Sequence, residues 1–144
     1  ELSPYKLEMK NILMAMTGGT VGKSYYVKAL DEDMYVNQRV ATIKISELID
    51  STYIHYSLRI PLIQNIIQEK KKSTNDNISM TDINNFLISL PPLEEQKTIV
   101  SKVNQLMAWC DELEKKIEKR DAYQEKMMQA VVKQAFKTEK EPIN

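Results

Sequence analysis

The sequence predicts an α+β domain, of mixed α/β character, followed by a long C-terminal coiled-coil helix. Short apolar and alternating segments fill the first part of the chain, which is typical of strands and short helices. From Leu90 to about Lys137 the chain contains no glycine, and after Pro92 it contains no proline. Apolar residues recur through that stretch in steps of three and four, as in a helix that packs against a second helix.

The composition limits what the protein can do. The chain has 144 residues and a formal net charge of zero. A protein that binds nucleic acid by charge alone is normally basic, so any DNA contact must come from a local patch. The single cysteine, Cys110, excludes an internal disulfide and is consistent with a cytoplasmic location. No apolar run has membrane-spanning length and no signal peptide is visible, so we expect no membrane contact.

The first part of the chain reads as three strands. The apolar run from Asn11 to Thr17 predicts a buried strand. All three glycines of the protein then fall between Gly18 and Gly22, which predicts a hairpin turn. The aromatic and β-branched segment from Ser24 to Lys28 predicts the second strand. Alternation at the end of the segment Tyr35 to Ser46 predicts the third.

From about Glu47 the spacing of apolar residues becomes helical. Apolar positions between Ile54 and Ile67 predict one or two helices, which Pro61 kinks or divides. The run Lys70–Lys72 closes this helical segment.

Shorter elements are expected before the long helix. Ser73 to Asn77 is polar and predicts a loop, and Ile78 to Met80 predicts a short strand. Thr81 is a candidate cap for a helical turn at Asp82–Asn85. The apolar segment Phe86 to Leu90 predicts a last strand.

The long helix has a clear start. Pro92 suits the first helical position, where its missing N–H group has no cost. Glu94 and Glu95 follow where carboxylates meet the positive end of the helix dipole, and Lys133 and Lys137 lie near the other end. At about 1.5 Å per residue the helix would be about 67 Å long.

The apolar positions of this helix form a coiled-coil seam, with a tryptophan beside it. Polar residues at Arg120 and Gln124 interrupt the seam, which weakens pairing but fixes its register. One interpretation is an amphipathic helix packed on its own domain. The other is pairing with a second long helix, which we favour because so small a domain cannot cover so long a seam. The seam residues are Ile99, Val103, Leu106, Trp109, Cys110, Leu113, Ile117, Met127 and Val131.

Three short segments are candidates for DNA contact. Backbone N–H groups, hydroxyls and lysines can bind phosphate oxygens, Asn and Gln can bind adenine, and Arg can bind guanine. The alternatives are a plain hairpin turn, a turn beside a solvated strand face, and a solvated helix end. The candidate residues are Gly19, Thr20, Lys23, Ser24, Asn37, Gln38, Arg39 and Lys71.

Other chemistry finds less support in the sequence. Gly22, Lys23 and Ser24 match the end of a phosphate-binding loop, but its first glycine would fall at Thr17. The residues after Ser24 favour a strand, whereas such a loop opens a helix. A nucleotide-binding enzyme remains an alternative that requires Lys23. His55 has no metal-ligand partner at a suitable spacing, so no metal is expected.

Three segments together carry a resemblance to a known family. LPPLEEQKTIVSKVNQLMAWCDELE resembles the start of a conserved region in the specificity (S) subunits of Type I restriction–modification systems. The upstream TGGTVGKSYYV and YVNQRVATIKI resemble the core of that family's target recognition domain. The resemblance implies that residues 1–90 are the C-terminal part of a target recognition domain. Residues 91–138 would be a spacer and dimerisation helix, and residues 139–144 a tail.

The resemblance also implies a function. The chain would be a non-catalytic subunit that reads one half of a bipartite site in double-stranded DNA and holds methyltransferase (M) subunits. S-adenosylmethionine would be bound by the M subunit, so no cofactor is expected in this chain, and a restriction (R) subunit can join the assembly. Family members typically carry two recognition domains, so we expect either a fragment or a half-subunit whose seam pairs antiparallel with a second spacer helix, for example in a homodimer. The alternative is a coiled-coil interaction module without DNA binding.

Overall fold

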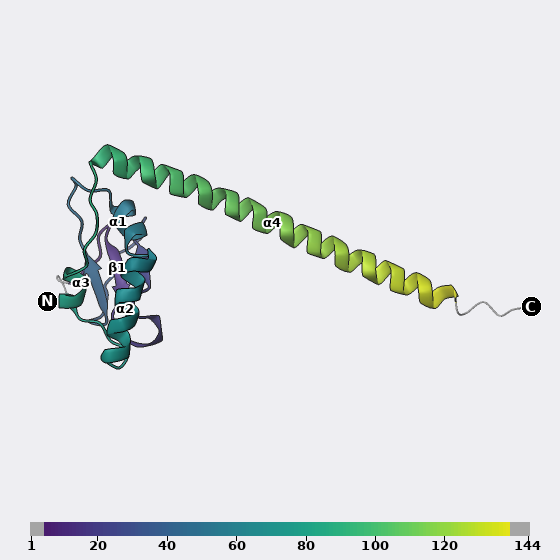
Figure 1. Cartoon of the computed structure of the whole chain (residues 1–144), viewed down its shortest axis with the longest axis horizontal. Coiled ribbons are helices and arrows are strands. Elements are labelled where there is room, and N and C mark those ends of the chain that lie inside the picture. The colour runs from purple at the N-terminus through teal and green to yellow at the C-terminus, as the bar shows by residue number, and fades with distance from the viewer. Residues whose placement is uncertain (1–4, 139–144) are drawn as a thin grey trace, which may run out of the picture. The chain divides into compact units, whose positions relative to one another are not determined.

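The computed structural model describes residues 5–138, with side chains as far as Phe136 (Figure 1). Two compact units are distinguished, Glu1–Ser101 and Lys102–Asn144. The predicted tail at residues 139–144 lies outside the described residues. In chain order the elements are β1 (Ile12–Ala15), η2 (Gly18–Thr20), β2 (Ser24–Tyr26), β3 (Val40–Ile43), α1 (Ser51–Ser57), α2 (Pro61–Ser73), α3 (Met80–Asn84) and α4 (Leu93–Thr138).

The three strands form one antiparallel sheet in the order β2-β1-β3. Leu13 in the central strand pairs with Tyr25 on one side and with Thr42 on the other. β1 and β2 are joined by the glycine turn, which contains the short 3₁₀ helix η2. The sheet thus contains the three strands that the sequence predicts, although β3 begins only at Val40 rather than at Tyr35.

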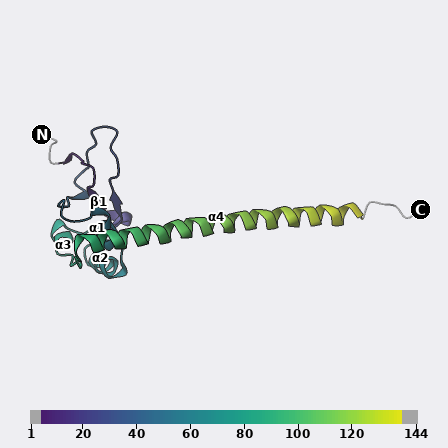
Figure 2. The ribbon, with the colours of Figure 1, turned by 90° about the horizontal axis from the view of Figure 1, so that it is seen from above.

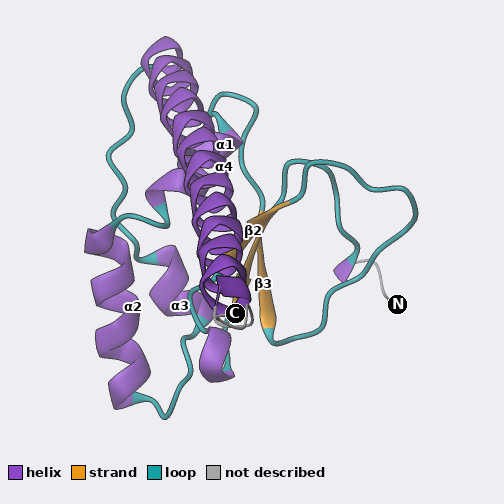
Figure 3. Cartoon of the chain, turned by 90° about the vertical axis from the view of Figure 1, so that its right-hand side faces the viewer, coloured by secondary structure: helices purple, strands orange, loops and turns teal. Residues whose placement is uncertain are grey.

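One side of the sheet packs against the short helices. Figures 2 and 3 both show α2 and α3 together on the same side of the strands. Because side chains alternate along a strand, every second residue faces this side. The buried residues of the core come from the sheet, the helices and the connections between them, and are Ile12, Met14, Val21, Ala41, Ile54, Leu58, Ile63, Ile67, Ile78 and Ile83. The predicted mixed fold is confirmed.

Local sequence explains where the helices begin. The side chain of Asp50 accepts a hydrogen bond from the backbone N–H of Tyr53 at 2.9 Å and so caps α1. Pro61 lies in the first turn of α2, where its missing N–H is tolerated. Pro61 therefore divides the helical segment into two helices instead of kinking one.

Three short predictions are wrong. Ile78–Met80 is not a strand: within residues 5–138 the pairing beside it is limited to one bridge, between Thr17 and Asn77, and Met80 already belongs to α3. Ser79, not Thr81, caps α3, because its side chain accepts from the N–H of Asp82 while the Asp82 carboxylate accepts from the N–H of Ser79. Such a capping box satisfies two N–H groups at once, which favours this start.

The segment Phe86–Leu90 is also not a strand. It lacks a neighbouring strand among residues 5–138, and Phe86 and Ile88 instead pack against the core from an irregular connection. An apolar run of this length is compatible with either arrangement, and only the position of its neighbours decides between them.

α4 is one continuous helix of 46 residues. The carbonyl of Pro92 accepts hydrogen bonds from the N–H groups of Glu95 and Gln96 at 2.9 and 3.0 Å. α4 therefore begins at Leu93, one residue after the predicted start at Pro92. Among residues 5–138 no helix is long and apolar enough to cross a membrane.

Candidate nucleic-acid interface

Two cationic residues among the predicted DNA contacts, Lys23 and Arg39, flank the end of β1. The N–H of Ala15 donates to the carbonyl of Lys23 at 3.0 Å, from the β2 side. The N–H of Met16 donates to the carbonyl of Arg39 at 2.9 Å, from the β3 side. Lys23 and Arg39 are separated by sixteen positions in sequence, yet the sheet places them on either side of one strand end. Both side chains are exposed.

The glycine turn brings the end of α2 to the same place. The N–H of Gly18 donates to the carbonyl of Asp76 at 2.9 Å, and the N–H of Asp76 donates to the carbonyl of Lys71 at 3.1 Å. Gly19 and Thr20 are exposed in this turn. Three segments that are distant in sequence therefore meet where β1 ends, and their residues are the ones that the sequence offers for DNA contact.

The lysines at the end of α2 differ in what they can offer. Lys70 pairs with Asp82 at 3.0 Å, and Lys71 is half-buried with its Nζ atom 3.7 Å from the carboxylate of Asp76. Lys72 is exposed and forms no ion pair with the residues that the structure describes. Sequence reasoning selected Lys71, although Lys72 is the lysine whose charge is uncompensated. We call Thr20, Lys23, Arg39 and Lys72 the cationic edge.

The residues Asn37–Arg39 form a turn that precedes β3 and do not lie on a strand edge, as the sequence suggested. The side-chain oxygen of Asn37 accepts a hydrogen bond from the N–H of Arg39 at 2.9 Å. This bond uses Asn37 to hold the turn. Gln38 and Arg39 are exposed, and their side chains are available to a ligand.

Ser24 differs from the other predicted contact residues in its burial. Its hydroxyl oxygen is buried and has no hydrogen-bond partner within residues 5–136. Ser24 also begins β2, so the glycine turn does not open a helix. The turn therefore lacks the helix N-terminus that holds the anion in a phosphate-binding loop.

No cluster of metal-ligating side chains accompanies this surface. Within the described part of the chain, no group of three or more His, Cys, Asp or Glu side chains could hold a metal ion. The Nε2 atom of His55 lies 3.4 Å from the carbonyl oxygen of Ser24, and its ring stacks near Tyr26 with centroids 6.1 Å apart. His55 is thus part of the packing between α1 and β2.

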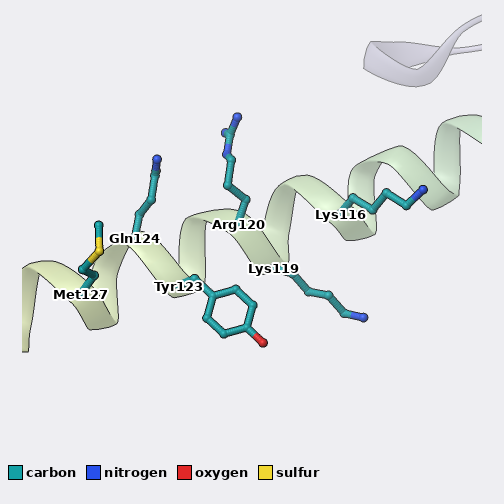
Figure 4. Close-up of a pocket in the computed structure, with 6 residues that line it drawn as sticks. All are labelled: Lys116, Lys119, Arg120, Tyr123, Gln124 and Met127. Atoms are coloured by element: carbon teal, nitrogen blue, oxygen red, sulfur yellow. The ribbon is translucent and has the colours of Figure 1, made fainter.

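The predicted seam is a separate feature on α4. Every seam residue is exposed except Val103, which is half-buried. The polar interruption lies in an open, shallow surface region of α4, where Arg120, Gln124 and Met127 point to the same side of the helix (Figure 4). The guanidinium of Arg120 donates to the carboxylate of Asp121 at 2.7 Å. The seam is therefore apolar on both sides of a polar interruption, in which Asp121 neutralises the charge of Arg120.

Sequence reasoning missed Gln96. Its side chain is 2% exposed, although it stands in the first turn of α4. Its Oε1 atom accepts from the N–H of Asp50 at 2.9 Å, and its Nε2 atom donates to the carbonyl of Pro91 at 2.7 Å. The available signal was that Gln96 lies three residues before Ile99, in phase with the apolar seam.

Comparisons with known proteins identify the family. The chain is 30% identical over 134 residues to the Type I restriction enzyme EcoBI specificity subunit of Escherichia coli, which covers 90% of this chain and 28% of that protein. It is 27% identical over 145 residues to the EcoKI specificity subunit of Escherichia coli strain K12, covering 96% of this chain and 31% of that protein. The chain thus spans less than a third of the length of either relative.

A solved structure shows the same fold. It comes from work on the complex assembly and conformational transition of the type I R-M system. The TM-score is 0.73 at 23% identity, over 92% of this chain and 32% of the other. Residues 2–120 match the family described as Type I restriction modification DNA specificity domain, and the chain therefore belongs to that family.

Proposed function

We propose that this chain recognises DNA for a Type I restriction–modification complex, as a non-catalytic subunit that reads one half of a bipartite site. The observation that carries the proposal is the meeting of three exposed segments at the end of β1, in a chain of the DNA specificity family. Proteins place positively charged side chains and free backbone N–H groups against phosphates, and they read bases with longer polar side chains. The cationic edge, the backbone of Gly19 and the side chain of Gln38 together offer both kinds of group, despite the zero net charge of the chain.

Within this proposal the residues have different tasks. Lys23, Arg39 and Lys72 would contact phosphates, together with Thr20 and the backbone of Gly19. Gln38, at the tip of its turn, would reach a base edge, because an amide can bind adenine with two hydrogen bonds. Asn37 would stabilise the turn through its hydrogen bond with the N–H of Arg39, and Lys71 would stabilise the end of α2 through its ion pair with Asp76.

The salt dependence of binding tests the cationic edge. Each phosphate contact that is lost makes the negative slope of log K against log salt less steep by about 0.9. Lys23→Gln and Arg39→Gln should each make the slope less steep by about that amount, and Lys126→Gln on α4 is the matched control. Equal slopes in all variants would show that DNA, if bound, lies elsewhere.

α4 would connect the unit Glu1–Ser101, which we call the recognition unit, to the rest of the complex. Its seam would pair with a second spacer helix, and methyltransferase subunits, which bring the S-adenosylmethionine, would dock on the helices. A restriction subunit would join the same assembly, in the cytoplasm. A second copy of this chain can provide the second helix: in a full antiparallel overlap Leu113 of one copy faces Ile117 of the other, while Cys110 faces Arg120. Rapid oxidation of Cys110 to an intermolecular disulfide would instead indicate parallel pairing.

A map of methylated adenines tests the whole proposal. The full-length gene is co-expressed with the neighbouring methyltransferase subunit in a host that lacks adenine methylation. A split, gapped motif that disappears without this chain supports the proposal. The absence of any modification, with the complex assembled, favours the alternative of a coiled-coil interaction module, which the zero net charge also allows.

A further inference from the structure

The start of α4 and the connection that precedes it are hydrogen-bonded to the start of α1 at two points. Gln96 accepts from the N–H of Asp50 at 2.9 Å and donates to the carbonyl of Pro91 at 2.7 Å. The hydroxyl of Tyr53, in the first turn of α1, donates to the carbonyl of Ser89 at 2.8 Å. Asp50 also caps α1 through the N–H of Tyr53. We call Asp50, Tyr53 and Gln96 the clamp.

The clamp has few alternative arrangements. Both ends of the Gln96 amide are bonded, and the side chain is buried. Breaking either bond without replacement leaves a buried polar group unpaired, which is costly. The hydrogen bond to Asp50 also spans 46 positions of sequence, so it joins elements that the chain does not connect directly.

We propose that the clamp fixes the direction in which α4 leaves the recognition unit, and that it thereby sets the gap between half-sites that the assembled complex accepts. This inference rests on the proposed function, because only a subunit that reads part of a split site has a gap to control. Asp50, Tyr53 and Gln96 are positioning residues in this view, since they would act through α4 and do not belong to the cationic edge.

The length of α4 makes small changes at its start important. With 46 residues at about 1.5 Å each, the helix is about 69 Å long. A tilt of about 3° at the first turn would move its far end by about 3.6 Å, which is close to the rise of one base pair. No glycine or proline interrupts the helix, so it contains none of the residues that most often produce a kink.

Three variants of the full-length subunit test the inference. Gln96→Met removes both hydrogen bonds and keeps a flexible side chain of similar length. Tyr53→Phe removes only the bond to Ser89. Gln105→Met makes the first substitution at an exposed position of α4 and is the matched control. Each is assembled with the methyltransferase subunit and supplied with duplexes whose two half-sites are separated by the native gap, or by one or two base pairs more or fewer.

The measured quantity is the methylation rate at the native gap divided by the rate at the altered gaps. The wild type and Gln105→Met should give the same high ratio, whereas Gln96→Met should lower it about tenfold and Tyr53→Phe should lower it less. An unchanged ratio in Gln96→Met overturns the inference. If that variant does not assemble, Tyr53→Phe decides alone. A wild-type complex that methylates no split site refutes the proposed function itself, so the two failures are distinguishable.

Discussion

The glycine turn allows a quantitative prediction, because its three glycines differ in backbone φ angle and in the space available for a Cβ atom. Gly18 and Gly22 have positive φ angles of 76° and 80°. A Cβ atom added at Gly22 would lie 2.6 Å from Cγ2 of Ile67, which is fully buried in α2. At Gly18 and Gly19 an added Cβ atom meets nothing within 4 Å.

Alanine should therefore affect the three positions in a fixed order. At Gly18 only the left-handed backbone is penalised, which costs about 1 kcal/mol of unfolding free energy. At Gly22 the same penalty adds to an overlap with a side chain that cannot move away, for a total of about 3 kcal/mol. At Gly19 neither cost applies, and the change should stay within about 0.5 kcal/mol.

Urea unfolding, followed by the near-ultraviolet circular dichroism of tyrosine, measures these changes. Six of the seven tyrosines lie at or before Tyr56, so the signal reports mainly on the recognition unit. The slope against urea concentration should be the same for all variants, which checks that the midpoints compare stability alone. A Gly22→Ala variant as stable as Gly19→Ala would refute the close approach of the turn to Ile67.

Three further predictions concern other parts of the chain. Leu113→Glu places a charge in the proposed seam and should weaken helix pairing by about tenfold or more in sedimentation equilibrium. Hydrogen bonds from Ser79, followed by that from Lys70, lower the pKa of Asp82 from 3.8 to about 2. The carboxylate thus stabilises the fold above pH 3.8, and its contribution is lost as the pH falls towards 2. Asp82→Asn should therefore make the melting temperature less dependent on pH in that window. Burial lowers the pKa of His55, so the unfolded chain binds its proton more readily. Melting temperature should therefore fall as the pH drops below about 6.5, and His55→Gln should reduce this fall.

The sequence predicts those parts of the fold whose signals are local. Pro61 in the first turn of α2, the glycine turn, and the unbroken run of α4 each depend on backbone preferences that neighbouring residues already define. The strands at Ile12–Ala15 and Ser24–Tyr26 were predictable for the same reason, because their apolar, aromatic and β-branched residues flank the glycine turn. In contrast, the apolar runs near Ile78 and Phe86 could become strands only with a neighbouring strand, which sequence cannot supply.

The candidate site was only partly predictable, because charge compensation and burial depend on distant residues. The pairing of Lys71 with Asp76 leaves Lys72 as the uncompensated lysine, and no local pattern distinguishes the two. The buried hydroxyl of Ser24 likewise follows from packing. Gln96 is the clearest case, since its partner Asp50 lies 46 positions earlier in the chain.

The cationic edge and the clamp lie near different ends of β1, the central strand of the sheet. The backbone carbonyls of Lys23 and Arg39 accept hydrogen bonds where β1 ends. Asp50 borders a surface cavity of about 780 Å³ together with Lys10 and Asn11, which directly precede β1. Side chains in the turn before β3 can therefore change without altering a contact of the clamp. Under the two proposals above, we therefore expect changes in that turn to alter DNA preference but not the direction of α4, and to leave the amide resonance of Asp50 unshifted.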